Sequence, residues 1–283
     1  MIKAEVLADS VSVDHNGNDV RLTTLLTTFP RFILAEMNTH RMLSKNSASS
    51  RAIPPEKQVE RIRRGKYFVP VFGSRVTGMG QGDKLSEDQQ YALQSQWRMS
   101  ALQAADDADR LLALGGDKSH INRILEPYLW HTAIISGTEW KNFFNLRIHP
   151  AAQPEIRQTA KTMLDAILGS TPRRIGVDLD RTGLPVIEWH LPLISEEERK
   201  TGLDLPMASA GRCARVSYEA HEKEESLADS AERARTLGAM AHWSPFEHPA
   251  MTAHSEMAAG WGNYQRPWFQ LRKCHSGEAI FGG

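Results

Sequence analysis

A short polar stretch near the start of the chain carries side chains that could bind an anion. Residues 38–51 contain His40, Arg41, Ser49 and Arg51, together with four further hydroxyls and two Asn amides. Only three of the fourteen side chains are apolar, so the segment does not fit a buried core. Guanidinium and hydroxyl groups bind phosphates and carboxylates well. The stretch therefore predicts a loop that holds a polar, anionic ligand.

A second polar cluster begins at Asn142. Residues 142–147 read Asn-Phe-Phe-Asn-Leu-Arg, and Gln153, Glu155 and Arg157 follow. In a helix, Asn142 and Arg147 lie on neighbouring faces while the two Phe side chains anchor the backbone. This cluster alone leaves two interpretations open, a ligand-binding helix and a surface arginine on an ordinary amphipathic helix.

Two further clusters lie after residue 210. In the segment 212–218, Arg215 and Ser217 could hold a phosphate through a guanidinium fork and a hydroxyl, although the segment alone favours an exposed turn beside a short strand. In the segment 242–248, two His and Glu247 could face a ligand. Metal is not expected there, because no third ligand stands at metal spacing and the HExxH pattern is absent.

The elements around the first polar loop are those of an antiparallel hairpin and a helix. Residues 2–13 alternate apolar and polar side chains, residues 16–19 supply a turn, and residues 20–29 read as the second strand. Pro30 suits the first turn of a helix whose apolar face includes Phe32, Ile33, Leu34 and Met37. This strand and this helix are therefore expected to set the position of the polar loop.

The remaining chain predicts mainly helices. We expect a break at 52–55 and a mobile surface loop in the Gly-rich tract 73–82, for which a lid is the alternative role. A capping box at Ser86 precedes a predicted helix at 91–114, whose apolar stripe is core. Further helices are predicted at 118–126, 129–148, 152–168 and 224–240, and the one at 129–148 is expected to be buried on most sides. Between them we expect a loop or short-strand region at 169–192, with a turn at 178–183, and a solvated run of charged residues at 196–200. The pattern favours one α+β domain over residues 1–283, a small antiparallel sheet packed with several long helices.

Composition narrows the class of protein. Lys plus Arg and Asp plus Glu both total 34 among 283 residues, so the chain lacks the basic balance of a general nucleic-acid binder. No apolar run reaches the roughly 18 residues of a membrane span. Cys213 and Cys274 lack CxxC spacing, and no signal-peptide pattern is present, which favours a reduced, cytoplasmic protein.

Four segments together resemble the flavin-dependent thymidylate synthases. Residues 41–51 resemble the first signature of that family, Arg-His-Arg-x-x-Ser-x-Asn-Glu-x-Ser-x-Arg, and residues 145–147 with 152–157 resemble the second. Residues 214–217 and 244–248, Ala-Arg-Val-Ser and Ser-Pro-Phe-Glu-His, resemble two more. In the family these last two segments come first, so their order here resembles a circular permutation, which surface termini lying close together would permit.

The resemblance implies a fold, a reaction and a set of site residues. It implies methylation of deoxyuridylate (dUMP) to dTMP with FAD, methylenetetrahydrofolate and NADPH, by a homotetramer with shared sites. It places flavin contacts at His40, Arg41, Asn142, Ser217, Ser244 and Glu247, with His242 nearby. It places contacts to the substrate phosphate and uracil at Ser49, Arg51, Arg123 and Arg147. Arg147 and Ser49 are the candidate catalytic residues, Arg147 because it could polarise a uracil carbonyl. Ser49 could also be a nucleophile, but no base with an orienting partner is visible, which favours a phosphate-binding hydroxyl.

Several positions depart from the family pattern. Thr39 replaces an Arg, Ser47 replaces a Glu, and Ser136-Gly137-Thr138 replaces an Asn-Ala-Arg segment. Lys45, Lys141 or Arg272 could substitute for the missing cations. These departures keep two alternatives open, a flavin enzyme that makes a modified pyrimidine such as a 5-hydroxymethyl nucleotide, and a non-catalytic nucleotide-binding relative. The unrelated thymidylate synthase that uses a cysteine thiolate is disfavoured, because neither cysteine follows a Pro.

Overall fold

The fold starts with a long antiparallel hairpin, as the alternating pattern predicts. In the computed structural model, which describes residues 1–77, 80, 82–176, 181, 186–202, 204–216, 225–253 and 262–275, strand β1 spans Lys3–Val13 and β2 spans Asp19–Pro30. The Asp14 carboxylate accepts hydrogen bonds from the backbone N–H groups of Asn16 and Asn18, both at 2.8 Å, and Gly17 takes a φ of +80°. These contacts close the turn and set the hairpin register.

The region 129–148 contains a strand and a short helix, so the prediction of one buried helix there was wrong. Strand β4 (Trp130–Gly137) pairs with β2, and helix α5 (Lys141–Arg147) follows it. Ile135 packs into the core under α5 and α6 (Pro154–Leu168), while its neighbour Ile134 packs toward α7 (Leu205–Arg215) on the other face. A strand buried on both faces reads as a continuous apolar run, which periodicity cannot separate from a buried helix.

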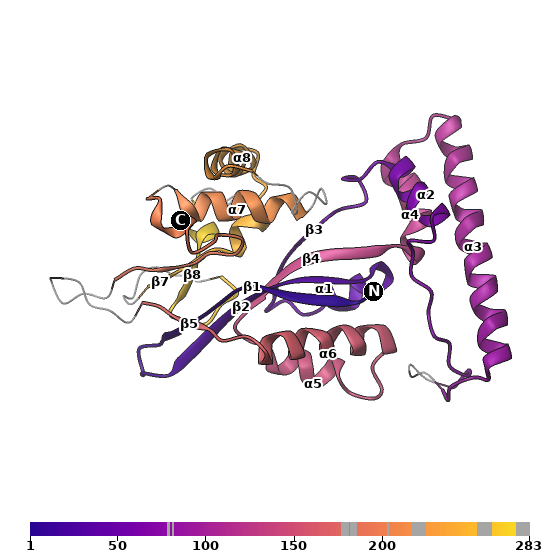
Figure 1. Ribbon diagram of the computed structural model, residues 1–283, viewed down its shortest axis with the longest axis horizontal. Helices are drawn as coiled ribbons and strands as arrows, with labels where there is room; N and C mark the ends of the chain where they lie inside the picture. Colours follow the sequence, from indigo (N-terminus) through magenta and orange to yellow (C-terminus); the bar gives the residue numbers. More distant parts are fainter. Residues whose placement is uncertain are drawn as a thin grey trace, which may run out of the picture.

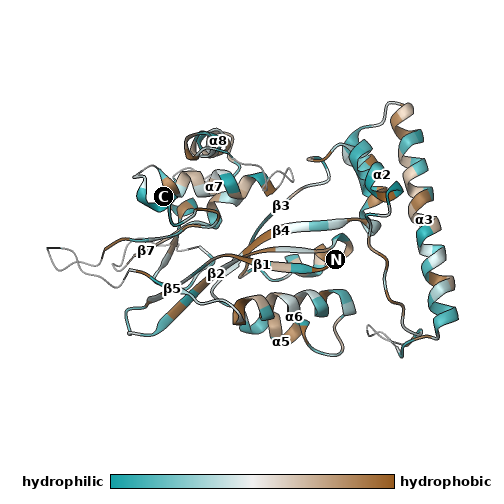
Figure 2. Ribbon diagram, in the orientation of Figure 1, coloured by the Kyte–Doolittle hydropathy of each residue, from teal (hydrophilic) through white to brown (hydrophobic). Residues whose placement is uncertain are grey.

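A five-stranded sheet forms the centre of the molecule. Its strand order is β3-β4-β2-β1-β5, where β3 (Ser44–Ser47) and β5 (Arg173–Arg174) are the edges and β5 alone runs parallel to its neighbour. Helices α5 and α6 lie on one side, and α7 and α8 (Leu227–Ala239) lie on the other (Figure 1). Hydrophobic residues gather along the middle of β1, β2 and β4, between these layers (Figure 2). The α+β prediction is confirmed.

A separate group of helices stands at one end of the molecule (Figure 1). It contains α2 (Pro55–Arg63), α3 (Glu87–Ala113), α4 (Lys118–Leu125) and the 3-10 turn η2 (Glu126–Tyr128). The capping box at Ser86 is confirmed, since the Ser86 hydroxyl and the Gln89 side chain bond to each other's backbone N–H groups. The apolar stripe of α3 is only partly in the core, which differs from the prediction. Its buried residues are Ala101, Ala105 and Ala108, while Met99 and Leu102 are exposed.

The C-terminal part of the chain forms a second layer over the sheet. Its elements are η3 (Glu198–Lys200), α7 (Leu205–Arg215), α8 (Leu227–Ala239), η5 (Ser244–Glu247), η6 (Leu271–Cys274) and a small sheet of β6 (Trp189–His190), β7 (Ala250–Thr252) and β8 (Trp268–Gln270). Helices α7 and α8 touch at Gly211, where an added Cβ would meet the Ser230 carbonyl oxygen at 1.8 Å. Only glycine permits this approach.

Two predictions for this part of the chain were wrong. Residues 205–215 form a helix, with Arg215 only 7% exposed, whereas the pattern favoured an exposed turn. The run 196–200 is more than a solvated surface, because Glu198 forms an ion pair with Arg212 at 2.6 Å. That contact lowers the pKa of Glu198 to about 2. The predicted turn at 178–183 lies almost wholly outside the described residues.

A buried chain of polar groups fixes the C-terminal layer to the sheet. The Ser136 hydroxyl on β4 lies 2.6 Å from the Thr24 hydroxyl on β2 and 2.8 Å from Nδ1 of His248. Thr24 also lies 2.8 Å from Nε2 of His190, whose Nδ1 lies 2.9 Å from the Ser10 hydroxyl. Burial lowers the pKa of His190 and of His248 to about 3. Both imidazoles are therefore neutral at pH 7.

Candidate functional site

The polar loop follows a short helical segment at the end of β2. The 3-10 turn η1 (Arg31–Ile33) and helix α1 (Leu34–Asn38) deliver His40 to a position beside α5. Arg147, the last residue of α5, donates from Nε to Nε2 of His40 at 2.8 Å and from a terminal nitrogen to the Thr39 hydroxyl at 3.0 Å. Residues from the first and second predicted motifs therefore meet directly.

The His40 imidazole is held neutral. Burial, the Arg147 guanidinium and the Lys45 ammonium lower its pKa to about 4, burial being the largest cause. A neutral ring leaves Nε2 free to accept the hydrogen bond from Arg147, which places the ring proton on Nδ1. His40 also packs edge-on against Phe143, with ring centroids 4.9 Å apart. The imidazole therefore fixes the direction in which Arg147 points.

A pocket of about 360 Å³ opens beside this contact. His40, Arg41 and Asn142, three of the predicted flavin contacts, line it together. Arg41 and Asn142 are exposed, and within the described part of the chain the Arg41 guanidinium has no ion pair. An unpaired cation, an amide and a neutral imidazole suit the phosphates and ring edge of a flavin. The donor set fits, but this volume is at the small end for a ligand pocket and holds only part of a dinucleotide.

Glu139 also lines this pocket, and the sequence analysis did not select it. It follows directly after Thr138, one of the positions that depart from the family pattern. Its carboxylate accepts a hydrogen bond from the Gln265 amide. That departure was the available signal, because a change of pattern at the end of β4 marked the same rim.

Lys45 stabilises the loop from within. Its ammonium donates to the backbone carbonyls of His40 and Leu43, at 2.6 and 2.7 Å. Burial lowers the pKa of Lys45 to about 8, although the nearby Glu247 carboxylate acts in the opposite direction. Of the three candidate substitutes for the missing cations, Lys45 is therefore engaged with the backbone and Arg272 is paired with Glu247, while Lys141 is exposed.

The far end of the loop is separate from this pocket. Ser49 and Arg51 are exposed, and the Ser49 hydroxyl accepts a hydrogen bond from the backbone N–H of Arg51 at 3.3 Å. Arg123, the fourth predicted substrate contact, is exposed and forms an ion pair with Glu126 at 3.1 Å. Neither Ser49 nor Arg51 lines the pocket beside His40. One chain thus presents its predicted phosphate-binding side chains to solvent.

The C-terminal motifs pack against the loop, even though some 200 residues separate them in the sequence. The Ser244 hydroxyl donates to the Asn46 carboxamide oxygen at 2.9 Å, and the Asn46 amide donates to the Cys213 carbonyl at 3.0 Å. Glu247 forms an ion pair with Arg272. His242 is exposed at the end of α8. The third and fourth motifs therefore support β3, the strand that continues the polar loop.

Arg215 does not serve as a phosphate ligand in this arrangement, which corrects that part of the prediction. Its guanidinium is buried and lies 3.6 Å from the Glu225 carboxylate. Because the guanidinium is paired and excluded from solvent, no phosphate edge can reach it. Ser217, its predicted partner, lies outside the described residues.

The positions that depart from the family pattern have structural roles. Thr39 accepts a hydrogen bond from Arg147, and Ser136 joins the buried chain that contains Thr24 and His248. The Thr138 hydroxyl accepts the backbone N–H of Gln265 at 3.0 Å. These hydroxyls connect the site to the sheet and to the C-terminal layer, where a longer cationic side chain would not fit the same contacts.

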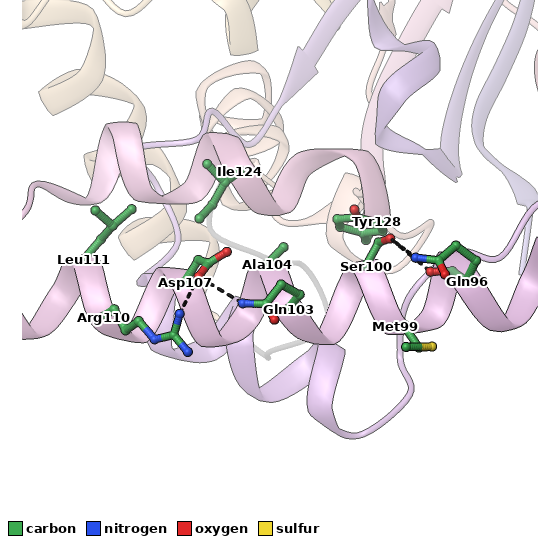
Figure 3. Close-up of a pocket in the computed structure, with 10 residues that line it drawn as sticks. All are labelled: Gln96, Met99, Ser100, Gln103, Ala104, Asp107, Arg110, Leu111, Ile124 and Tyr128. Atoms are coloured by element: carbon green, nitrogen blue, oxygen red, sulfur yellow. Dashed lines mark hydrogen bonds and ion pairs between the residues drawn. The ribbon is translucent and has the colours of Figure 1, made fainter.

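A larger groove of about 790 Å³ lies away from all predicted site residues, between α3 and α4 (Figure 3). Asp107 accepts hydrogen bonds from Gln103 and Arg110 along its floor, and Leu111 and Ile124 face it from the two helices. Gln96 also donates to the Ser100 hydroxyl, at 3.5 Å. Most polar side chains of this groove are therefore engaged with one another.

Neither a metal site nor a membrane span is found in the described part of the chain. Among those residues no cluster of three or more His, Cys, Asp or Glu could hold a metal ion. None of the described helices is long and apolar enough to cross a membrane.

Comparison with known proteins gives one family match. The family model of thymidylate synthase complementing proteins matches residues 18–173, more than half of the chain, and the segments 214–217 and 244–248 lie outside it. Among curated proteins no match is found.

Solved structures that are similar to the chain include three of two proteins. Two are of the UMP/dUMP methylase PolB from Streptomyces cacaoi. The structure bound with 5-Br UMP has 17% identity and a TM-score of 0.46, and the match covers 59% of this chain and 88% of that chain. The structure bound with 5-Br dUMP has 15% identity and a TM-score of 0.45, and the match covers 59% of this chain and 89% of that chain. The third is Thymidylate Synthase X from Helicobacter pylori with FAD and dUMP (20% identity, TM-score 0.35, 52% of this chain and 67% of that chain).

Proposed function

Because the chain belongs to the thymidylate synthase complementing protein family, we propose that it catalyses the flavin-dependent methylation of dUMP to dTMP. Methylenetetrahydrofolate is the carbon donor and NADPH the reductant in this proposal. The observation that carries it is the contact of Arg147 with His40 beside the pocket that Arg41 and Asn142 line. It supports the proposal because two motifs, more than a hundred residues apart, meet at one pocket.

Arg147 is the residue to which we give the central role. A guanidinium fixed by His40 and Thr39 keeps its remaining N–H groups in one direction, ready to donate to a uracil carbonyl oxygen. Donors held in place before reaction stabilise the charge that develops on that oxygen as C5 becomes nucleophilic. The flavin supplies the redox and carbon-transfer chemistry when it is bound.

The other site residues bind and orient. Arg41 and His40 face the cofactor pocket, and Asn142 offers an amide that both donates and accepts. Ser244 and Glu247 act by supporting β3 and the loop, through Asn46 and Lys45. Ser49, Arg51 and Arg123 supply a hydroxyl and two cations for the substrate phosphate. Ser49 is a phosphate-binding group in this proposal.

The site requires more than one chain. The pocket beside His40 holds only part of a dinucleotide, and Ser49 and Arg51 face solvent away from it. We therefore propose a homo-oligomer, a tetramer by analogy with the family, in which one chain's substrate-binding arginines face another chain's flavin pocket. We also propose that the protein is cytoplasmic and that its motif order arose by circular permutation.

A modified-pyrimidine activity is the second candidate function. Thr39, Ser47 and Thr138 motivate it, since hydroxyls stand where the family has charged groups. Incubation with dUMP, deoxycytidylate, methylenetetrahydrofolate and NADPH, followed by mass analysis of the nucleotide, separates the two. A product 14 mass units heavier than dUMP supports methylation, whereas a 5-hydroxymethyl product refutes dTMP synthesis.

The absorbance of the purified protein tests both proposals together. Bound FAD gives a yellow protein with visible flavin absorption. A colourless protein that takes up no added FAD would exclude both enzyme proposals and leave a nucleotide-binding relative without catalysis.

A further inference from the structure

The turn at residues 48–53, which carries two of the proposed phosphate ligands, is held from behind by a buried polar cluster. The Asn122 amide, 2% exposed, donates to the backbone carbonyls of Ser50 and Ile53 at 2.6 and 2.8 Å. The Arg31 guanidinium donates to the Ser50 hydroxyl at 3.0 Å. These bonds fix the backbone of the turn, so its exposed side chains leave from a defined position.

Arg31 is the fixed cation of this cluster. Its guanidinium donates to the Ala48 carbonyl at 3.3 Å, at the start of the same turn. A terminal nitrogen also lies 2.9 Å from Nδ1 of His131, and burial lowers the pKa of that imidazole to about 3. The neutral ring accepts a hydrogen bond from the guanidinium. Arg31 is therefore bound to the turn and to the central sheet at once.

Glu126 connects Arg31 with Arg123, another of the proposed phosphate ligands. Its Oε1 accepts from the Ser50 hydroxyl and lies 2.9 Å from an Arg31 terminal nitrogen. A terminal nitrogen of Arg123 donates to both carboxylate oxygens, at 3.1 and 3.2 Å. Burial acts to raise the pKa of Glu126, but the Ser50 hydrogen bond and the two guanidiniums outweigh it and lower that pKa. The ionised carboxylate thus holds Arg123 beside the turn.

The two ion pairs of Glu126 differ in how readily they break. The Arg31 side chain is 11% exposed, whereas the Arg123 side chain is 64% exposed. Separating a buried ion pair leaves an uncompensated charge and is costly, but an exposed pair contributes little to stability. A phosphate monoester carries a charge of about −1.5 to −2 at pH 7 and binds guanidinium strongly. Such an anion therefore displaces the carboxylate from Arg123 and leaves Arg31 in place.

We propose that Glu126 sets the preference of the site for a nucleotide over a nucleoside, because it holds Arg123 in the free chain and releases it to the substrate phosphate. Before binding, the carboxylate keeps the Arg123 guanidinium near Ser49 and Arg51. On binding, the phosphate takes the place of the carboxylate on Arg123, while Glu126 stays paired with Arg31. This inference rests on the proposed binding of dUMP and adds to it a residue that opposes binding until a phosphate is present.

Titration calorimetry with the full chain and saturating FAD tests this exchange. Glu126→Gln keeps one oxygen for Ser50 and Arg31 but puts an amide NH₂ in place of the second oxygen, so that Arg123 is released. We expect dUMP to bind roughly two- to fivefold more tightly, the factor that an exposed ion pair represents. Deoxyuridine, which has no phosphate, binds as it does to the wild type. A purely structural role for Glu126 predicts weaker binding of both ligands, and that result would overturn the proposal.

Two comparisons separate the ion pair from the loss of charge alone. Glu60→Gln removes the same charge from an exposed pair with Arg64, and it leaves the affinity for dUMP unchanged. Arg123→Gln by itself weakens dUMP binding severalfold. In that background Glu126→Gln gives a gain at least twofold smaller than in the wild type, because no pair remains to be broken. An equal gain in the two backgrounds would contradict the exchange.

A structure of the wild-type protein with FAD and dUMP gives an answer even if Glu126→Gln fails to fold. We expect the Arg123 guanidinium on the phosphate and beyond ion-pair distance of Glu126, with the pair between Glu126 and Arg31 intact. An Arg123 that stays on Glu126 while dUMP is bound would overturn this inference and leave the methylation proposal standing. Absent dUMP binding by the wild type would refute both.

Discussion

Arg147 and His40 form the most informative pair of residues in the molecule. The guanidinium donates to an imidazole that burial and two neighbouring cations keep neutral, with a pKa of about 4. The contact therefore persists across the physiological pH range. It fixes the orientation of the one cation that the family resemblance places at the uracil.

Replacing Arg147 tests this assignment. Arg147→Ala removes the proposed donors to the substrate while losing only contacts at a half-exposed helix end, so we expect the fold to remain and the affinity for dUMP to fall at least tenfold. Arg147→Lys restores charge without the planar fork and recovers little of the affinity. Titration of dUMP into FAD-loaded protein measures both.

Arg64→Ala is the matched control, since Arg64 is the C-cap residue that follows α2 and forms an exposed ion pair with Glu60. Its dUMP affinity stays at the wild-type value. An Arg147→Ala variant that binds dUMP normally would refute the role of Arg147.

The cysteines give a second residue-scale prediction. Cys213 is fully buried, which raises the pKa of its thiol, and desolvation raises the pKa of the Cys274 thiol although that residue is exposed. A thiolate nucleophile is thus disfavoured at both positions. We expect Cys213→Ala with Cys274→Ala to keep turnover within about twofold, with a stability loss of about 1 kcal/mol from the buried position. Loss of dTMP formation in a folded double variant would indicate thiol chemistry.

Residue types were predictable where the motif itself specified them. His40, Arg41 and Asn142 do line one pocket, and Arg147 stands beside it. Glu139 was not selected from the sequence, although the change of pattern at Thr138 marked the same rim. Its place in the lining of the pocket is determined by the packed fold.

At the scale of elements, Gly211 sets the distance between α7 and α8. An Ala side chain there would meet the Ser230 carbonyl, and backbone atoms cannot rotate away as side chains do. We expect Gly211→Ala to lower the free energy of unfolding by about 1–3 kcal/mol or more, the usual cost of overpacking. Urea unfolding at pH 7.5 measures it.

Gly238 on α8 is the control for that variant. An added Cβ there meets the Phe246 ring at 3.4 Å and the Trp243 ring at 3.6 Å, which are ordinary van der Waals contacts, and alanine favours a helix. Gly238→Ala is therefore neutral or stabilises by up to about 1 kcal/mol. Equal losses in the two variants would contradict the close approach at Gly211.

The elements that sequence patterns predicted well are those with one buried face. The hairpin, α4, α6 and α8 have clear periods and termini, and each stands within a few residues of its prediction. Strand β4 was mistaken for a helix because both its faces are buried, and α2 was missed because its polar composition hides a narrow apolar side formed by Val59 and Ile62.

At the scale of the whole molecule, four histidines couple stability to pH. His40, His131, His190 and His248 have pKa values lowered to between about 3 and 4, mainly by burial. In the unfolded chain they return to about 6.5. Below pH 6.5 the unfolded state therefore binds protons that the folded state does not, and the free energy of unfolding falls as the pH falls.

Urea unfolding between pH 6.5 and 5 measures this effect, because carboxylates titrate mostly below that window. Each histidine contributes a slope of up to about 1.4 kcal/mol per pH unit. We expect His248→Gln to reduce the slope by the contribution of one histidine, and a substitution at the exposed His242 is the control. An unchanged slope in His248→Gln would contradict its neutral burial.

The two edges of the central sheet bear on how the protein behaves at high concentration. One edge is β3, four residues with the sequence Ser-Lys-Asn-Ser, and the other is β5, two arginines. Short, polar and cationic edge strands are poor templates for a strand from another molecule. The apolar strands β2 and β4 are enclosed between them. Partial unfolding of β3, which Asn46 and Ser44 hold to the C-terminal layer, would expose β4 and so promote aggregation.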